Sequence, residues 1–176
     1  KATVDYYVSG LANTVETISF APGVIANGEV SGSQYIFSIP ETVTGTATDG
    51  ESEGTIEVFQ GQYLQAGFIV DGSDSQRYIL PNNSIDTSTI IVKVRENASS
   101  TTQIEYKLVD NILGITSTSN IYLIQETTDE KYELLFGDDV FGKKLDSGNI
   151  ITISYIKTEG ISGNGAQEFK FAGTLR

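Results

Sequence analysis

The residue types that carry most enzymatic chemistry are scarce in this chain of 176 residues, which contains neither Cys nor His. Without them the chain has no thiolate nucleophile, no Ser-His-Asp triad and none of the usual zinc sites. Carboxylates remain, because 23 residues are Asp or Glu. Asp138, Asp139 and Asp146 form the one close acidic cluster beside a turn, and oxygen ligands of this kind suit a calcium ion.

A structural interpretation of this acidic cluster fits the sequence better than a metal site. Its spacing lacks the DxDxDG pattern and the closing Glu of a calcium loop, and Asp71 and Asp74 fail the same test. Asp is also a common turn former, because its side chain accepts hydrogen bonds from the nearby backbone. We therefore predict that these residues shape turns, and that the chain binds no metal and no cofactor.

Catalysis by a pair of carboxylates is the remaining enzymatic option. Glycoside hydrolysis needs two such groups in a defined arrangement, but nothing in the sequence distinguishes one pair among the 23 acids. The chain also has no G-x-S-x-G nucleophile elbow, no GxGxxG and no P-loop. We predict that the protein is not an enzyme and has no small-molecule substrate.

The elements that must position the acidic turn are two strands. Tyr132, Leu134 and Phe136 alternate along one face of a run that is typical of a strand. Gly137-Asp138-Asp139 interrupts this run, and a second, basic turn follows at 142–144. Residues 149–156 are rich in β-branched and aromatic side chains and predict the next strand.

Strand-like runs recur about every 8–12 residues along the chain, with turn residues between them, which favours a sandwich or barrel. Further strands are predicted at 3–8, 14–20, 35–39, 55–60, 63–70, 77–80, 90–95, 103–108, 120–125 and 167–171. A loop is predicted around Gly28 and Gly32, and a loop or a subdomain boundary over the polar, Gly-rich and acidic stretch 44–54. We predict an all-β, antiparallel sandwich-like or barrel-like fold with little helix. It divides into a small β subdomain at 1–61 and a β domain at 62–176 that carries the Gly-Asp turn.

The charge of the chain limits its partners. The net charge is −12, and residues 1–76 hold ten acids but one base, Lys1. Such a chain repels phosphate backbones, so we predict no nucleic-acid partner. No apolar run is long enough to span a membrane, so we predict no membrane partner either. The acidic half serves solubility or a basic partner, and we favour solubility.

The order of residues around the acidic turn resembles the baseplate J-like family, most closely its large wedge members from contractile-tailed phages. The matching positions are Phe136-Gly137-Asp138, Gly142, Leu145, the strand Ile151–Tyr155 and Asn164-Gly165-Ala166. The family's third turn residue is usually Gly, whereas this chain has Asp139, a residue that tolerates left-handed geometry less well than Gly. The resemblance extends over Ser52–Thr174. The absence of Met suggests that the chain is cut from a longer protein.

This resemblance implies a structural subunit of a phage tail baseplate wedge, located in the virion and assembled in the host cytoplasm. It implies self-association into a dimer or ring, and contacts with other baseplate wedge proteins during assembly and sheath contraction. The residues expected to set the shape of the turn are Gly137, Asp138, Gly142 and Leu145, within a motif that also includes Phe136 and Tyr155. We expect Gly137→Val to destabilise the domain by roughly 1–3 kcal/mol if the turn is strained.

A second hypothesis fits the same composition. An acidic, Cys-free chain rich in Thr and Gly is also compatible with a secreted or surface β domain that binds carbohydrate or calcium. Melting that depends on calcium, or binding to a glycan array, would favour this alternative.

Overall fold

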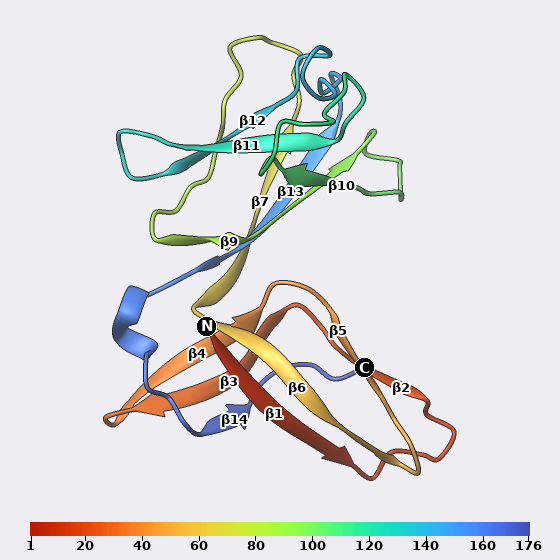
Figure 1. Cartoon of the computed structure of the whole chain (residues 1–176), viewed down its shortest axis with the longest axis vertical. Coiled ribbons are helices and arrows are strands. Elements are labelled where there is room, and N and C mark those ends of the chain that lie inside the picture. Colours follow the sequence, from red (N-terminus) through yellow and green to blue (C-terminus); the bar gives the residue numbers. More distant parts are fainter. The chain divides into compact units, whose positions relative to one another are not determined.

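The computed structural model describes all 176 residues, which form fourteen β-strands and one short 3-10 helix. The strands are β1 (Ala2–Ser9), β2 (Thr17–Phe20), β3 (Gly23–Val30), β4 (Ser33–Ile39), β5 (Val43–Thr46), β6 (Glu51–Gln60), β7 (Gln62–Ile69), β8 (Tyr78–Ile79), β9 (Ile85–Arg95), β10 (Ile104–Leu108), β11 (Ile121–Glu126), β12 (Tyr132–Phe136), β13 (Ile150–Lys157) and β14 (Phe169–Phe171). The helix η1 is Gly160–Gly163 (Figure 1). The predicted all-β fold with little helix is confirmed. No helix combines the length and the apolar character needed to cross a membrane.

The chain folds into two compact units. The first contains residues 1–64 together with 156–176, and the second contains residues 65–155. The first boundary lies three residues from the predicted split after Gly61. The predicted domain at 62–176 differs from the structure at its C-terminal end, because β14 pairs with β3 of the first unit. A pairing between strands so far apart in sequence leaves no local signal from which it can be read.

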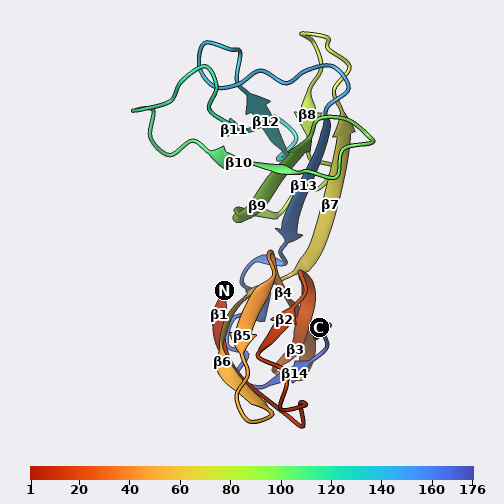
Figure 2. The ribbon, with the colours of Figure 1, turned by 90° about the vertical axis from the view of Figure 1, so that its right-hand side faces the viewer.

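The first unit contains a five-stranded sheet in the order β1-β6-β4-β3-β14, and a separate pair formed by β2 and β5 (Figure 2). Residues of β1 alternate between partly buried and exposed, as expected for a strand with one face on a core. That core contains Ile18, Phe20, Ile25, Ala26, Phe37, Ile39, Ala47, Ile56 and Val58.

Two stretches predicted as loops are strands in this unit. The residues around Gly28 belong to β3, and the stretch 44–54 contains part of β5 and the start of β6. A side chain on Gly28 would overlap the ring of Phe37, with a Cβ only 2.8 Å from Phe37 Cε2. Gly in these strands therefore makes room for neighbouring rings, rather than breaking the sheet.

The second unit is built on a seven-stranded sheet in the order β7-β13-β9-β10-β11-β12-β8. β9 has the predicted alternation, with Ile90, Val92 and Val94 buried and Lys93 exposed. The pairing is antiparallel wherever β12 meets β11 and β8, but β10 and β11 are parallel. Their connection has room for the crossover because it runs from Val109 to Asn120.

Candidate functional site

The predicted turn motif lies in the loop between β12 and β13, where two glycines meet backbone to backbone. A Cβ placed on Gly137 would lie 2.2 Å from the carbonyl carbon of Gly142 and 2.7 Å from its Cα. Gly142 has a φ of +83°, and a Cβ there would lie 2.4 Å from Ile121 Cγ1. Both positions therefore require glycine, the first because of space and the second because of space and backbone conformation.

The two carboxylates of the turn accept hydrogen bonds from their own loop. Asp138 Oδ1 accepts the backbone N–H groups of Val140 at 3.0 Å and Phe141 at 2.8 Å. The bond from Phe141, followed by that from Val140, lowers the pKa of Asp138 below its ordinary value. Asp139 has a φ of 68°, and its Oδ1 accepts the N–H of Lys144 at 2.9 Å. Asp139 thus adopts the left-handed geometry that Gly adopts more readily, and it ties the loop together.

The turn is fixed to the crossover segment that precedes β11. The N–H of Gly142 donates to Thr116 O at 3.1 Å, and the N–H of Lys143 donates to Ser119 O at 2.8 Å. Within the turn, the N–H of Asp139 donates to Gly142 O at 2.9 Å. Leu145, the last residue of the predicted motif in this loop, is buried. These contacts give the turn a single defined shape.

Phe136 and Tyr155 have separate surroundings. The Phe136 ring packs edge-to-face against Tyr78 and Tyr106, with centroid distances of 5.3 and 5.7 Å. Tyr155 is fully buried, and its hydroxyl donates to Asn82 Oδ1 at 2.7 Å. The structure therefore brings Phe136, Gly137, Asp138, Gly142 and Leu145 into one segment, whereas Tyr155 is anchored to the loop after β8.

The spacing Gly137-x-x-x-x-Gly142-Lys143 also matches most of a phosphate-binding loop. The match is incomplete, because Lys144 stands where that loop needs Ser or Thr. A phosphate-binding loop also leads into a helix whose N-terminus faces the anion, whereas this loop leads into β13. Asp138 and Asp139 add negative charge to the loop, which disfavours a phosphate.

A shallow depression of about 210 Å³ lies beside the turn. Lys144 Nζ lies 3.3 Å from Asp74 Oδ1 at its edge, in a pair that is largely exposed to solvent. An exposed pair of this kind contributes little to stability. No group of three or more His, Cys, Asp or Glu side chains is placed to hold a metal ion. The hydrogen bonds of Asp138 and Asp139 hold the loop between β12 and β13 in shape.

Sequence reasoning missed an ion pair between an exposed arginine and a buried carboxylate on the other face of β12. Glu133 has an exposed fraction of 4% and accepts two hydrogen bonds from Arg77, both at 2.7 Å. Gln125 Nε2 donates to the same carboxylate at 2.7 Å. The hydrogen bond from Arg77 is the main cause that lowers the pKa of Glu133. The available signal was a Glu in the middle of a strand that is otherwise apolar.

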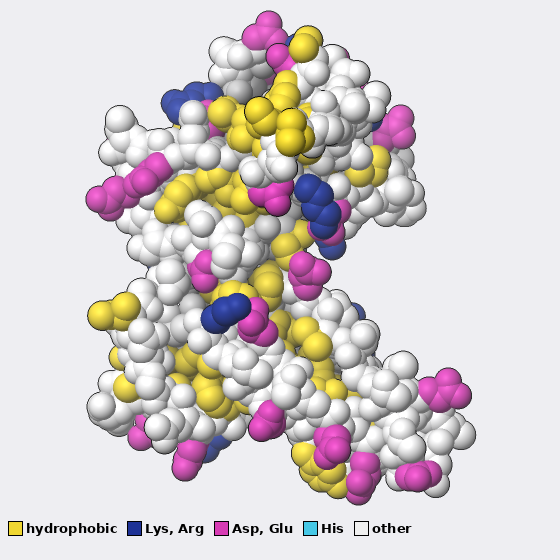
Figure 3. All heavy atoms as spheres, in the orientation of Figure 1, with side chains coloured by type: hydrophobic (Ala, Val, Ile, Leu, Met, Phe, Trp, Pro, Cys, Tyr) yellow, Lys and Arg dark blue, Asp and Glu magenta, His cyan; other side chains and the backbone are white.

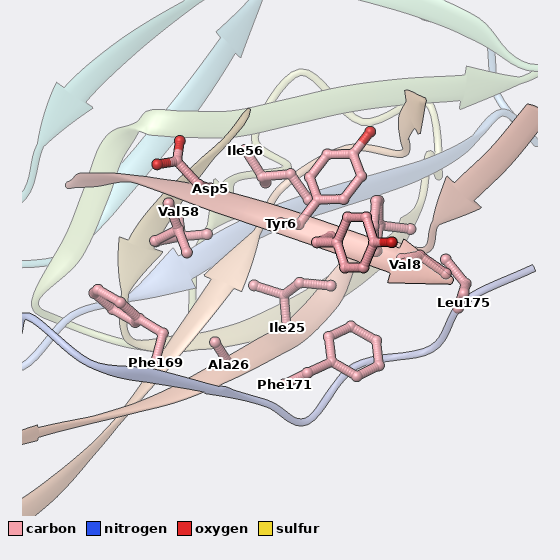
Figure 4. A pocket seen from close by; sticks show the side chains of 13 residues that line it. Asp5, Tyr6, Val8, Ile25, Ala26, Ile56, Val58, Phe169, Phe171 and Leu175 are labelled. Atoms are coloured by element: carbon pink, nitrogen blue, oxygen red, sulfur yellow. The ribbon is translucent and has the colours of Figure 1, made fainter. Parts of the chain in front are cut away.

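The first unit contains a second candidate that the sequence did not reveal, an apolar cavity of about 400 Å³. Its walls come from β1, β2, β3, β6, β14 and Leu175 (Figure 4). Asp5 is the only charged residue among those that line it, and its side chain points away from the space between the strands (Figure 4). The cavity is suited to apolar groups.

A scan against models of known protein families finds no match to this chain, and a search of curated proteins finds no similar sequence. The functional argument therefore depends on the residues and geometry of the two units. The turn between β12 and β13 joins five residues of the family resemblance, Phe136, Gly137, Asp138, Gly142 and Leu145, in one loop.

Proposed function

We propose that this protein is a structural subunit of a phage tail baseplate wedge, which makes subunit contacts during baseplate assembly and sheath contraction. The observation that carries the proposal is the turn Phe136–Leu145. It contains five of the residues on which the family resemblance depends, and their contacts hold a loop in shape. In this proposal rigid β units keep subunit geometry while interfaces exchange between two packings.

The chemistry of the side chains supports a mechanical role over a catalytic one. The chain has no His and no Cys, and Asp138 and Asp139 accept hydrogen bonds from the loop they belong to. Glu133, the one buried carboxylate, is paired with Arg77. Hydrogen bonds lower the pKa of Asp138 and that of Glu133, whereas a general acid needs a raised pKa.

Exposed apolar side chains support a role in making contacts. Leu123 and Leu135 face each other across β11 and β12, and both are exposed. Ile112, Leu113 and Val140 are more exposed still. Hydrophobic side chains reach the visible surface of the protein in Figure 3. Apolar residues gathered at the surface are typical of interfaces between proteins.

The partners in this proposal are further copies of the chain, in a dimer or ring, and other baseplate wedge proteins. The location is the virion tail, after assembly in the host cytoplasm. The proposal includes no metal, no cofactor and no substrate.

Light scattering on the 176-residue chain tests self-association, with and without calcium. We expect a dimer or larger species that is indifferent to calcium. Leu123→Glu should lower the mass toward that of a monomer, because it places a charge at the centre of the exposed apolar pair. Ile69→Glu is the matched control, since Ile69 is also exposed but lies on β7. A monomer that responds to calcium would contradict the proposal and favour a calcium-binding domain.

A further inference from the structure

The sheet of the first unit leaves two strand edges without partners. β1 pairs with β6 alone, and β14 pairs with β3 alone, so these two strands form the ends of the five-stranded sheet. In an antiparallel pair, about half of the backbone N–H and C=O groups of each strand point away from its partner. The free edge of β1, which spans Ala2–Ser9, therefore offers a row of donors and acceptors to a further strand.

Both unpaired strands line the same apolar cavity. β1 runs along one side of it, and the segment with Phe169 and Phe171 runs along the other, with Ile25 and Ala26 between them (Figure 4). Phe171 lines the cavity although its exposed fraction is 59%, so it marks the opening. A volume of about 400 Å³ lies within the range of pockets that hold ligands, roughly 300–1,000 Å³. It has room for aliphatic side chains that enter between the two edges.

The outer face of the β1–β6 pair is acidic. The residues that are opposite one another on this face include Thr3 and Glu57, Tyr7 and Glu53, and Ser9 and Glu51. Asp5 lies between Thr3 and Tyr7 on the same face. Lys1 precedes β1 and pairs with Glu57 at 2.8 Å, and Lys170 is the one base on β14. A strand added at the free edge of β1 would therefore place its outward side chains next to Asp5, with the glutamates of β6 one strand further away.

We propose that the opening between β1 and β14 binds an extended peptide strand along the free edge of β1. Every second side chain of this peptide is apolar and enters the cavity, and the side chains between them include Lys or Arg. Strand addition of this kind draws affinity from main-chain hydrogen bonds and selectivity from pockets for alternate side chains. The proposal stands on the first unit alone and does not depend on the baseplate function.

A peptide strand uses all three features together, which other occupants do not. A small apolar molecule would fill the cavity but would leave the backbone edge and the acidic face unused. A second copy that pairs through its own β1 would bring the Asp5 residues of both copies onto neighbouring strands, and like charges on neighbouring strands are destabilising. The acidic face therefore favours a basic partner over self-pairing.

The experiment measures binding of a fluorescent nine-residue peptide that alternates Val with Lys to the full chain, by anisotropy. Three control peptides change one feature each: Val to Ser, Lys to Glu, and methylation of the central backbone nitrogens. We expect each control to bind at least about tenfold more weakly, since each removes one source of affinity. These comparisons use the unaltered protein, so they do not depend on the folding of any variant.

Variants of the protein locate the site. Phe171→Ser should weaken binding of the Val-Lys peptide about tenfold, and Ile161→Ser is the matched control, because Ile161 is exposed in the same unit but does not line the cavity. Asp5→Asn should weaken binding of the Val-Lys peptide but not binding of the peptide in which Glu replaces Lys. Equal binding of the methylated peptide would overturn the proposal in favour of a site for small apolar molecules. If the chain dimerises and Phe171→Ser abolishes the dimer, the occupant of the opening is a second copy and the peptide proposal is wrong. If the Val-Lys peptide does not bind at all, the proposal is also wrong.

Discussion

The close approach of Gly137 to Gly142 yields a prediction whose magnitude follows from the contacts. In Gly137→Ala the new Cβ would lie 2.2 Å from a backbone carbon of Gly142, so one of the two backbones must move. Gly142 cannot yield freely, because Ile121 lies behind it and its N–H and C=O are bonded to Thr116 and Asp139.

Moving Gly142 far enough to relieve the overlap breaks two or three hydrogen bonds, including that from Lys143 to Ser119. At about 1 kcal/mol net for each bond, we expect Gly137→Ala to destabilise the second unit by about 2–3 kcal/mol. The cause differs from the strained turn expected from the sequence, since Gly137 is not among the glycines with positive φ. A single methyl group is therefore sufficient, and valine is not needed.

Denaturant unfolding of both proteins measures this difference, and thermal unfolding should show a decrease of at least about 8 °C for a unit of this size. Gly67→Ala is the matched control, because a Cβ there meets nothing closer than Ile151 O at 3.9 Å. It should be neutral or stabilise by up to about 1 kcal/mol. If Gly137→Ala stays within about 0.5 kcal/mol of the original protein, the glycine contact does not hold the turn.

Three further predictions follow from buried polar groups. Arg77→Ala should lower the melting temperature more at pH 7 than at pH 3. The folded-state pKa of Glu133 is lowered, so its ion pair stabilises the fold at pH values above the ordinary pKa of Glu, and this stability is lost as the pH falls through the folded-state pKa. Equal effects at both pH values would contradict this. Tyr155→Phe should destabilise by about 1 kcal/mol in denaturant unfolding, since it removes the bond to Asn82; an unchanged midpoint would count against it. Burial raises the pKa of Tyr122 to about 12, so absorbance titration should show its ionisation only well above pH 10 unless the chain unfolds, with Tyr122→Phe identifying the signal.

Local patterns predicted the strands whose side chains alternate clearly. β9, β12 and β13 were found from the sequence because β-branched and aromatic residues mark them and turn residues bound them. The acidic turn was also predicted, since Gly and Asp act through their own backbone geometry. The sequence did not show why position 137 requires glycine, because Gly142 comes close to it only when the loop is folded.

What sequence reasoning missed depends on contacts between distant segments. Gly45 and Gly54 appeared to be loop residues, yet both lie against the Tyr6 ring, which covers the places their side chains would occupy. The partner of Glu133 was hidden for the same reason, since Arg77 is 56 residues away in sequence. The cavity requires β1 and β14, which come from opposite ends of the chain.

The division of the first unit between residues 1–64 and 156–176 has a consequence for how the protein is made. On the ribosome, residues 65–155 are complete and able to fold while the first unit still lacks β14. The bonds between Ser19 and Arg176 join residues 157 positions apart, so they form only after Arg176 has been added to the growing chain. Until then Phe20 and its neighbours lack their cover of Phe171 and Leu175, and the nascent chain exposes an apolar surface that a chaperone can recognise.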